Sequence, residues 1–396
     1  MQTVVVKRPQ LEVADVFRAH GHRLGGLNEQ QRRVVAAITS CRTAGLGGHA
    51  WECDRGCGYQ DISYNSCRNR HCPKCQGLDR VRWLEARMKD LLPVPYFHLV
   101  FTIPSQLYGL FLEHPRVTYG LLFRAVAETV KEVAARPKNL GAEIGMTAVL
   151  HTWTQTLLFH PHIHCIVPGG GLDPAGCRWV RARDNFFLSV RVLSTVFRAK
   201  LLSGLEKAIA SGRIKALLGN GADVSGLLRH AARRKWVVYS KRPFAGPKQV
   251  LAYLGRYTHR IAIGNERIVA MDGGEVVFSY RDRRDGNSRK LATLPAEAFL
   301  RRFLLHVLPK GFVRIRHYGL LANSVRQERM ALCRRLLGAP KEIADPVPRE
   351  PWSELLLRLT SKDVLCCPNC GGRLQTTVLI EAIGCTRRIE QRAGSP

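Results

Sequence analysis

The spacing of apolar and polar positions divides the chain into helical and strand-like stretches. Helical patterns occupy residues 1–40, 78–92, 106–135, 190–217, 247–259, 294–307 and 320–337. Strand-like runs, rich in β-branched and aromatic residues, occupy residues 96–104, 146–167, 235–240 and 261–280. Strands and helices that alternate in this way predict an α+β fold in which one sheet is covered by helices.

Three changes in composition indicate where the chain is divided into larger units. Asn28 can cap the helical pattern that follows it, and Pro93 and Pro95 stop the helix that ends near residue 92. Residues 41–77 are rich in Gly and Cys, which predicts loops. We expect four domains: an N-terminal helical segment (1–40), a cysteine-rich module with its linker helix (41–92), a long mixed domain (93–338), and a proline-rich linker with a C-terminal cysteine knuckle (339–396).

The charge of the chain favours a polyanionic partner. Lys and Arg number 61 against 31 Asp and Glu, a formal net charge of +30. Nucleic acid would neutralise this excess, although a solvated arginine-rich surface would give the same count. No uncharged apolar run reaches the roughly 18 residues of a membrane span, and no apolar block opens the chain. We therefore expect a cytoplasmic protein without a membrane partner.

Thirteen cysteines in a chain expected to stay in a reducing compartment favour metal binding over disulfides. Cys72 and Cys75 are separated by two residues, the spacing that lets one turn present two thiolates to a tetrahedral ion. We expect Cys53 and Cys57 to complete a structural zinc site with them. Three residues separate this pair, so a neighbour could replace either ligand. The available neighbours, enough for a second ion, are Cys41, His49, Cys67 and His71.

A further group of cysteines lies near the C-terminus. Cys367 and Cys370 have the two-residue separation and are followed by two glycines, but they form only half of a zinc ribbon. Cys366 and Cys385 could act as additional ligands. The sequence leaves open whether this C-terminal knuckle binds metal.

Cations surround the first cysteine group: Arg55, Arg68, Arg70, Lys74 and Arg80. A loop module stiffened by zinc could present such side chains to phosphates, the contacts that position a protein on DNA. A purely structural role for the module is the alternative. We select Arg68, Arg70 and Lys74 as the residues expected to contact DNA.

His162 and His164 form a His-x-His pattern within a strand-like run. Residues i and i+2 of a β-strand point to the same face, so the two imidazoles would converge. A divalent cation could bind there if a third protein donor joins them and positions stay open for a phosphate oxygen. We expect Gln155, on the neighbouring strand, to be that donor. Weaker candidates are His98, His160 and Gln249.

A helical pattern at 247–259 carries Tyr253 and Tyr257, which are four residues apart. Helical neighbours at this spacing have Cβ atoms about 5–6 Å apart, so two phenols could share one site. An ordinary phenol, with a pKa of roughly 10, needs nearby cations to act as a nucleophile, and Arg256 and Lys248 are close in sequence. An isolated pair of this kind usually consists of amphipathic aromatics at the edge of a core.

Together these motifs resemble the HUH endonuclease superfamily, and closely the two-tyrosine rolling-circle transposases of the IS-ninety-one insertion-sequence family. The resemblance covers nearly the whole chain. It is carried, in order, by YNSCRNRHCPKCQ, FHLVFTIP, HTWTQTLLFHPHIHCIVPGGGL, KRPFAGPKQVLAYLGRYTHRIAIGN and RHYGLLAN. The chain departs from the family in the upstream knuckle, which usually has two residues between its cysteines where three separate Cys53 and Cys57.

The resemblance implies the roles of several residues. By it, His162 and His164, with Gln155 as our expected third ligand, bind a catalytic Mg²⁺ or Mn²⁺. Tyr253 and Tyr257 are the nucleophiles. We further expect Arg256 to assist catalysis, Lys248 and Arg260 to contact DNA, and Cys67 to join the zinc ligands Cys53, Cys57, Cys72 and Cys75.

The resemblance also implies a fold and an activity. Residues 93–338 would form an HUH nuclease domain, an antiparallel sheet with the histidine strand central and the tyrosine helix packed across from it. Residues 41–75 would form a zinc-binding DNA module. The protein would nick and rejoin single-stranded DNA at element ends and target through 5′-phosphotyrosine links, associate with the nucleoid, and could form oligomers.

Three other functions fit parts of the sequence. A replication initiator or plasmid relaxase would use the same chemistry at an origin. A zinc-dependent DNA-binding regulator would have no catalysis, and a zinc hydrolase built on the His-x-His pattern would cleave without a covalent adduct. The cysteine-rich module and the RHYGLLAN segment favour the transposase.

Overall fold

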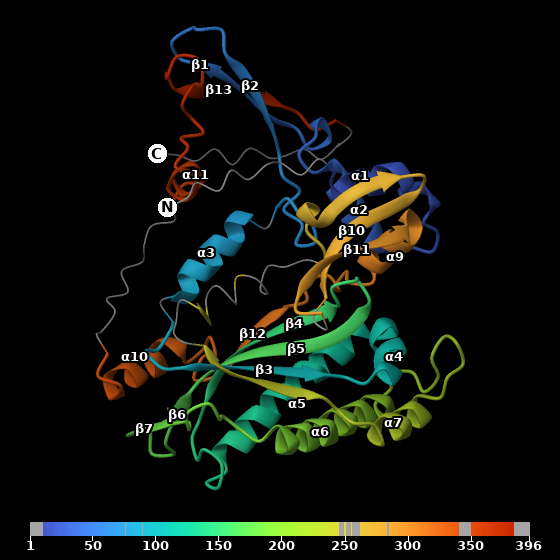
Figure 1. Cartoon of the computed structure of the whole chain (residues 1–396), viewed down its shortest axis with the longest axis vertical. Helices are drawn as coiled ribbons and strands as arrows, with labels where there is room; N and C mark the ends of the chain where they lie inside the picture. Colours follow the sequence, from blue (N-terminus) through green and yellow to red (C-terminus); the bar gives the residue numbers. More distant parts are fainter. Residues whose placement is uncertain are drawn as a thin grey trace.

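A computed structural model describes residues 11–75, 77–88, 90–244, 249–250, 255, 262–282, 285–339 and 350–383 (Figure 1). The described helices are α1 (Val13–His20), α2 (Glu29–Ser40), α3 (Gly77–Met88), α4 (Tyr108–Glu113), α5 (Pro115–Ala135), α6 (Val190–Ala210), α7 (Val224–Ala232), α9 (Ala296–Leu304), α10 (Arg326–Leu336) and α11 (Trp352–Thr360). The described strands are β1 (Gly48–Cys53), β2 (Gln60–Tyr64), β3 (Tyr96–Thr102), β4 (Gly145–Trp153), β5 (Phe159–Pro168), β6 (Gly170–Leu172), β7 (Trp179–Arg181), β8 (Val238–Phe244), β9 (Ile268–Asp272), β10 (Glu275–Asp282), β11 (Ser288–Pro295), β12 (Ile315–Gly319) and β13 (Leu374–Ile380).

Five described strands form the central sheet, in the order β12-β4-β5-β3-β8. Each neighbouring pair is antiparallel. The histidine strand β5 therefore lies in the middle of the sheet, as predicted. The predicted α+β class, with an antiparallel sheet covered by helices, is confirmed.

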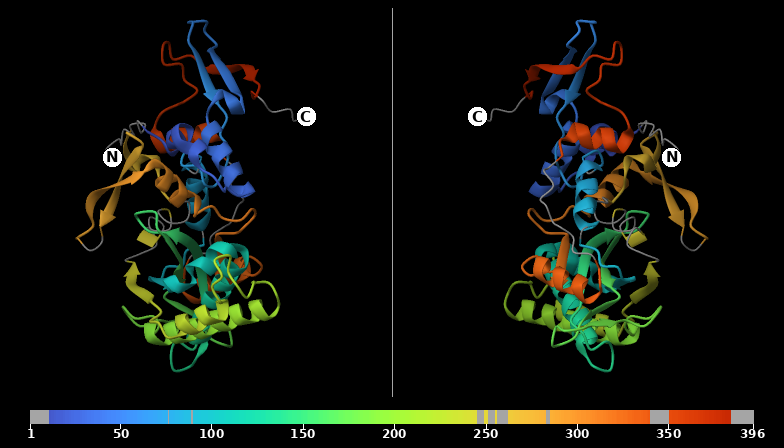
Figure 2. Two further views of the ribbon diagram at one scale, coloured as in Figure 1. Left: turned by 90° about the vertical axis from the view of Figure 1, so that its right-hand side faces the viewer. Right: turned by 90° about the vertical axis from the view of Figure 1, so that its left-hand side faces the viewer.

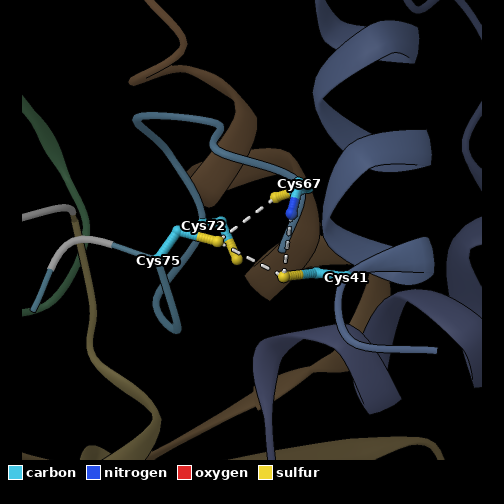
Figure 3. Close-up of side chains that lie close together, drawn as sticks. All are labelled: Cys41, Cys67, Cys72 and Cys75. Carbon is cyan, nitrogen blue, oxygen red and sulfur yellow. Dashed lines mark hydrogen bonds between the residues drawn. The ribbon is translucent and has the colours of Figure 1, made fainter. Parts of the chain in front are cut away.

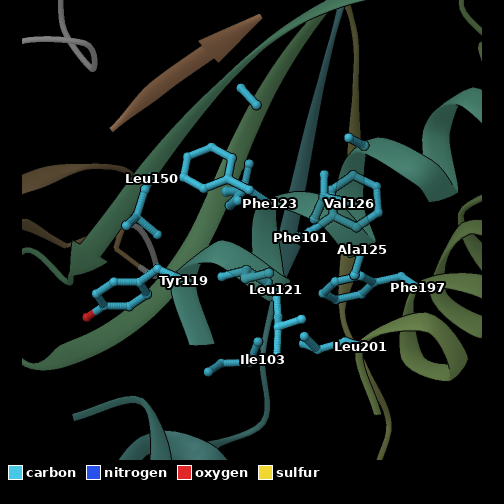
Figure 4. Packing of buried hydrophobic residues seen from close by; sticks show 14 of the residues in the cluster. Phe101, Ile103, Tyr119, Leu121, Phe123, Ala125, Val126, Leu150, Phe197 and Leu201 are labelled. Atoms are coloured by element: carbon cyan, nitrogen blue, oxygen red, sulfur yellow. The ribbon is translucent and has the colours of Figure 1, made fainter. Parts of the chain in front are cut away.

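One face of the central sheet packs against helices α5 and α6. Alternate residues of β3 and β5, among them Phe101 and Ile163, are fully buried in one large apolar cluster with both helices. The Phe101 ring meets Phe197 of α6 edge to face, with centroids 5.2 Å apart, and Phe123 of α5 joins the same core (Figure 4). Each such fully buried side chain contributes about 1.5–3 kcal/mol to stability, so this face holds the sheet together.

A second unit combines the N-terminal helices with the sheet β11-β10-β9 and α9. The Phe17 and Phe303 rings pack edge to face at 5.7 Å between α1 and α9. The side chain of Asn28 accepts a hydrogen bond from the backbone N–H of Gln31, which confirms the predicted cap of α2. Residues far apart in sequence thus share one core.

A third sheet, the ribbon, has the strand order β13-β1-β2 and joins both ends of the chain. Figure 2 shows the blue β1–β2 hairpin beside the red β13 at one end of the molecule. The prediction of loops over residues 41–77 is therefore wrong in part, because two strands form there. β13 also lies with the cysteine-rich module, whereas the sequence suggested a separate C-terminal knuckle.

Several predicted boundaries also change. The strand-like run expected at 235–240 extends to Phe244, and the helix expected from 320 begins only at Arg326, after strand β12 and a turn. The sequence pattern did not predict α7, β11 or β12. No helix among the described residues is long and apolar enough to cross a membrane.

Candidate active site and cysteine clusters

Three histidines converge on the face of the central sheet opposite α5 and α6. His162 and His164 share one face of β5, and the β4–β5 register places His151 directly opposite His162. A ring nitrogen from each of the three lies within 4.8 Å of the others. His151 and His164 are buried, while His162 is partly exposed. The arrangement is a set of three imidazoles with access from one side.

Hydrogen bonds orient these rings. The Nδ1–H of His162 donates to the carbonyl oxygen of His160 at 2.6 Å, so its Nε2 carries the lone pair that can coordinate a cation. The Nδ1 of His164 is 2.8 Å from the Nε2 of His98, a buried residue of β3 whose ring stacks on it. Imidazoles that bind metals usually make such a second bond, because it fixes the tautomer and the ring orientation.

Gln155 does not lie on the neighbouring strand, where we predicted it. It lies in the turn between β4 and β5, and its backbone carbonyl oxygen accepts a hydrogen bond from the side chain of the buried Arg267 at 2.5 Å. His151, and not Gln155, lies beside His162 and His164, where we expected the third donor. The sequence analysis missed His151, although counting back through a short hairpin from His162 would have found it.

The weaker candidates for a third ligand have other environments. The ring of His98 is hydrogen-bonded to the ring of His164, and the Nδ1 of His160 is 2.5 Å from the hydroxyl of Tyr108. Gln249 is exposed. Neither His98 nor His160 belongs to the group of converging imidazoles among the described residues.

The predicted nucleophiles and their neighbours lie outside the described residues: Tyr253, Tyr257, Arg256, Lys248 and Arg260. Two described residues place the start of their segment. Val250 is fully buried in a cluster that includes Ile166 of β5. Ile166 is two residues beyond His164 and shares its face of the strand. Val250 thus shares an apolar cluster with a residue of the histidine-bearing face.

Four cysteines form the knuckle cluster: Cys41, Cys67, Cys72 and Cys75. Figure 3 shows their side chains pointing toward one another. The sulfurs of Cys41 and Cys75 are 3.3 Å apart, and those of Cys67 and Cys75 are 3.6 Å apart. Cys41 ends α2, and the other three lie in the loop after β2, where the N–H of Cys75 donates to the carbonyl of Cys72.

The knuckle cluster has the chemistry of a structural zinc site. Four sulfurs around one zinc ion at about 2.3 Å would lie about 3.8 Å from one another. The described separations are close to this value and far above the roughly 2.05 Å of a disulfide. Hydrogen bonds from the neighbouring thiols lower the pKa of Cys75. The four residues therefore fit one tetrahedral zinc ion.

Four other cysteines form the ribbon cluster: Cys53, Cys57, Cys367 and Cys370. The prediction that Cys53 and Cys57 complete the site of Cys72 and Cys75 is therefore wrong. Cys41 and Cys67 occupy those positions. His71 belongs to neither described cysteine group; it is buried, and its Nε2 accepts from the N–H of Leu308.

The predicted DNA-contacting cations differ in their surroundings. Arg70 donates to the carbonyl of Phe312, and Lys74 forms an ion pair with Glu12 at 2.5 Å. Both bonds would have to break before these charges could reach a phosphate. Arg68 is exposed and remains our candidate for a DNA contact.

Two family models match the chain. A model described as "Putative transposase" (Y2_Tnp) covers residues 145–329, which include the three histidines. A model described as "Transposase zinc-binding domain" (Zn_Tnp_IS91) covers residues 12–103, which include the knuckle cluster. The matches define the protein as a transposase with a zinc-binding domain.

Two curated relatives are similar over almost their whole length. "Putative transposase y4qJ" of Sinorhizobium fredii is 47% identical and aligns over 94% of this chain and 96% of its own. The transposase for insertion sequence element IS801 of Pseudomonas savastanoi pv. phaseolicola is 27% identical over 97% of this chain and 92% of its own. The chain belongs to the IS91 (IS-ninety-one) transposase family, as the sequence motifs indicated.

Solved structures resemble the chain only distantly. A conjugative relaxase TrwC in complex with oriT DNA, in a metal-bound structure, is 14% identical and covers 62% of this chain and 94% of its own. The TM-score is 0.25. A copper-bound structure of the same relaxase gives 13% identity and a TM-score of 0.24. These scores are too low to bear on the assignment of the site.

Proposed function

We propose that this transposase nicks and rejoins single-stranded DNA through a 5′-phosphotyrosine intermediate at the histidine-bearing face of the central sheet. The observation that carries the proposal is the convergence of His151, His162 and His164 from two neighbouring strands. Three imidazoles suit a divalent cation that keeps positions open for a phosphate oxygen. We assign His151, in place of Gln155, as the third ligand.

The chain's own residues prepare this site before DNA arrives. His98 and the His160 carbonyl hold the two β5 imidazoles in fixed orientations, so the rings need little reorganisation when a phosphate binds. Trp153 stacks on His151 with ring centroids 4.7 Å apart and limits its rotation. A bound Mg²⁺ or Mn²⁺ would polarise a non-bridging phosphate oxygen and orient the phosphorus for in-line attack.

One tyrosine of the pair Tyr253 and Tyr257 then attacks the phosphorus. A bond forms between the phenol oxygen and phosphorus, the bond from phosphorus to the 3′ oxygen breaks, and the released 3′-hydroxyl takes up the proton. One diester replaces another, so bond energy is kept for rejoining, without water or ATP. Arg256 supplies positive charge that favours the phenolate. A second tyrosine could hold a second strand at the same time.

DNA is the proposed partner of the whole molecule. The net charge of +30 and membership of a transposase family support it. The zinc-binding domain, with the exposed Arg68, would contact the DNA backbone beside the nuclease site. Similarity to two transposases over nearly their full length favours this function over a replication initiator or relaxase of the same chemistry.

A labelled single-stranded oligonucleotide carrying an element end tests the proposal. With Mn²⁺, the full-length protein is expected to form a covalent adduct that survives denaturing electrophoresis, and mass spectrometry should locate it on Tyr253 or Tyr257. Tyr253→Phe/Tyr257→Phe should abolish the adduct. Tyr239→Phe, which changes an exposed tyrosine of β8, is the matched control and should keep it.

The histidines are tested in the same assay. His151→Ala should reduce adduct formation by roughly 100-fold or more, because the site loses one of the three imidazoles proposed to hold the cation that stabilises charge on the phosphate. An all-imidazole set also accepts Ni²⁺ and Zn²⁺, so each ion is tried separately. Cleavage without an adduct would indicate a hydrolase, and binding without cleavage would indicate a regulator; either result overturns the proposal.

A further inference from the structure

We propose that the ribbon cluster binds a second zinc ion and that this ion joins the two ends of the chain into one module. Cys53 ends β1, Cys57 follows in the β1–β2 turn, and Cys367 and Cys370 precede β13. More than three hundred residues separate the two pairs, since the partners Cys53 and Cys370 are 317 positions apart. The matched zinc-binding domain, residues 12–103, contains only half of these ligands.

The sulfur positions fit one tetrahedral ion. The Sγ atoms of Cys53 and Cys370 are 3.3 Å apart, those of Cys57 and Cys367 are 3.5 Å apart, and all four lie within 4.8 Å of one another. Zinc with four thiolates at about 2.3 Å places the sulfurs about 3.8 Å apart. A disulfide would need a separation of roughly 2.05 Å, so the four thiols form a metal site and not two crosslinks.

Each pair of thiols lies on a tight backbone turn. The N–H of Gly56 donates to the carbonyl of Cys53 at 3.1 Å, and the N–H of Gly371 donates to the carbonyl of Cys367 at 3.0 Å. Both glycines have a positive φ, 63° and 72°, which other residues adopt only with strain. The two turns therefore present two thiolates each, as the halves of a zinc ribbon do.

The two turns also pack directly against each other. The N–H of Asp54 donates to the carbonyl of Arg373, and the N–H of Arg373 donates to the Asp54 carboxylate, both at 2.9 Å. A Cβ on Gly372 would lie 2.9 Å from the sulfur of Cys53. The backbone is thus shaped to bring the C-terminal thiols to the N-terminal pair.

Burial of apolar side chains cannot account for the docking of β13 on the β1–β2 hairpin. Most residues of β2 and β13 are exposed, and Val378 and Leu379 of β13 are 56% and 70% exposed. Small sheets without a core of their own are commonly held by a structural metal. A zinc ion in the ribbon cluster supplies the missing link between β13 and the β1–β2 hairpin.

Metal content of the full-length protein tests the proposal. In the His151→Ala background, which removes one ligand of the histidine site, inductively coupled plasma mass spectrometry should find about two zinc ions per chain and about one after Cys367→Ser/Cys370→Ser. Cys366→Ser is the matched control: this cysteine adjoins Cys367 but does not belong to the cluster, so about two ions should remain. Cys72→Ser/Cys75→Ser empties the other cluster and should also leave about one.

Hydrogen exchange of the same variants gives a second readout. Cys367→Ser/Cys370→Ser should speed exchange in β1, more than three hundred residues away, and leave β5 unchanged. Zinc content equal to that of Cys366→Ser would overturn the proposal, and iron in the ribbon cluster would overturn the identity of the ion. Neither readout requires DNA cleavage, so failure of the tyrosine chemistry would not affect this result.

Discussion

The central sheet and the ribbon are both antiparallel, but their side chains are buried to very different extents. Nearly every residue of β4 and β5 is buried, and one face of these strands packs on α5 and α6. In the ribbon, β2 and β13 are mostly exposed, and the buried residues at the ends of β1 are Gly48 and Cys53. The first sheet has an apolar core, and the second has thiols.

The difference shows two ways to stabilise a small sheet. Burial of large side chains needs neighbouring layers, which the central sheet has in its helices. The ribbon consists of one layer at the end of the molecule (Figure 2). A tetrahedral ion can replace a core there because its bond strength does not depend on the exclusion of water from a wide surface. Each region should therefore respond to a different perturbation.

Removal of zinc should have the largest effect, and only in the cysteine-bearing regions. Structural zinc contributes roughly 10 kcal/mol to small domains, so a strong chelator should lower hydrogen-exchange protection in β1, β2 and β13 by about 100-fold or more. Exchange in β3, β4 and β5 should stay the same. Hydrogen-exchange mass spectrometry of the full-length chain measures protection in both sheets in one experiment. An equal loss of protection in the ribbon and in the central sheet would contradict the comparison.

Truncation of a core aromatic should have the opposite distribution. Phe101 of β3 is fully buried against α6, so Phe101→Ala should lower the free energy of unfolding of the unit built on the central sheet by about 3–5 kcal/mol in urea titrations. The zinc content should not change. Phe186→Ala removes a ring that is 50% exposed and should cost about 0.5 kcal/mol or less. Equal losses from both substitutions would disprove the assignment of the core.

Acid should weaken the fold in part through His306, a buried imidazole that follows α9. Burial lowers the pKa of His306 to about 4 from the ordinary value of about 6.5. Between these values the unfolded chain takes up a proton that the folded chain excludes, so stability falls as pH falls. Each pH unit in this window should cost roughly 1.4 kcal/mol.

Unfolding in urea from pH 7 to pH 4 measures this dependence. His306→Gln keeps a donor for the carbonyl of Leu157, which the ring contacts at 3.1 Å. It should make the profile shallower by roughly 1.4 kcal/mol per pH unit, while His71 and His317, whose pKa values burial also lowers, keep the rest of the slope. His230→Asn changes an exposed histidine and should leave the slope as in the wild type. A profile unaffected by His306→Gln would show that another group causes the acid sensitivity.

The smallest effect should come from one added methyl group in the ribbon. In Gly372→Ala, the new Cβ would lie 2.7 Å from the carboxylate of Asp54 as well as close to Cys53. We expect about tenfold weaker zinc binding at the ribbon cluster, about 1.4 kcal/mol, in competition with a chromophoric chelator. Gly120→Ala in α5 meets nothing within 4 Å and should not change zinc affinity. Unchanged zinc affinity in Gly372→Ala would argue against close packing of the two cysteine-bearing turns.

Local patterns predicted much of the central sheet and its helices. The runs that became β3, β4 and β5 and the helices α5 and α6 follow directly from apolar spacing, because these elements are long and strongly periodic. The strands β2 and β13 were missed, since most of their residues are exposed and show little alternation, and β1 was missed within a segment rich in Gly and Cys. β12 was missed because it has only five residues, all of them partly buried, so it shows no alternation of apolar and polar positions.

The cysteine groups show the same division. The spacing of Cys72 and Cys75 predicted one half of a site, and that of Cys367 and Cys370 predicted another half. No local rule could pair these halves correctly with Cys41, Cys67, Cys53 and Cys57. The pairing depends on how α2 ends and on how β13 docks on β1, which are contacts between distant segments.

The amino-acid sequence alone determined the kinds of chemistry present: thiols for zinc, imidazoles two apart on one strand face, and paired phenols on a helical pattern. Only the tertiary structure decided which of these groups lie close enough to share an ion. Register brought His151 to His162, and chain closure brought Cys370 to Cys53. The reason is physical: backbone periodicity sets directions over a few residues, whereas a metal site needs convergence within a few ångströms, which only packing of distant segments provides.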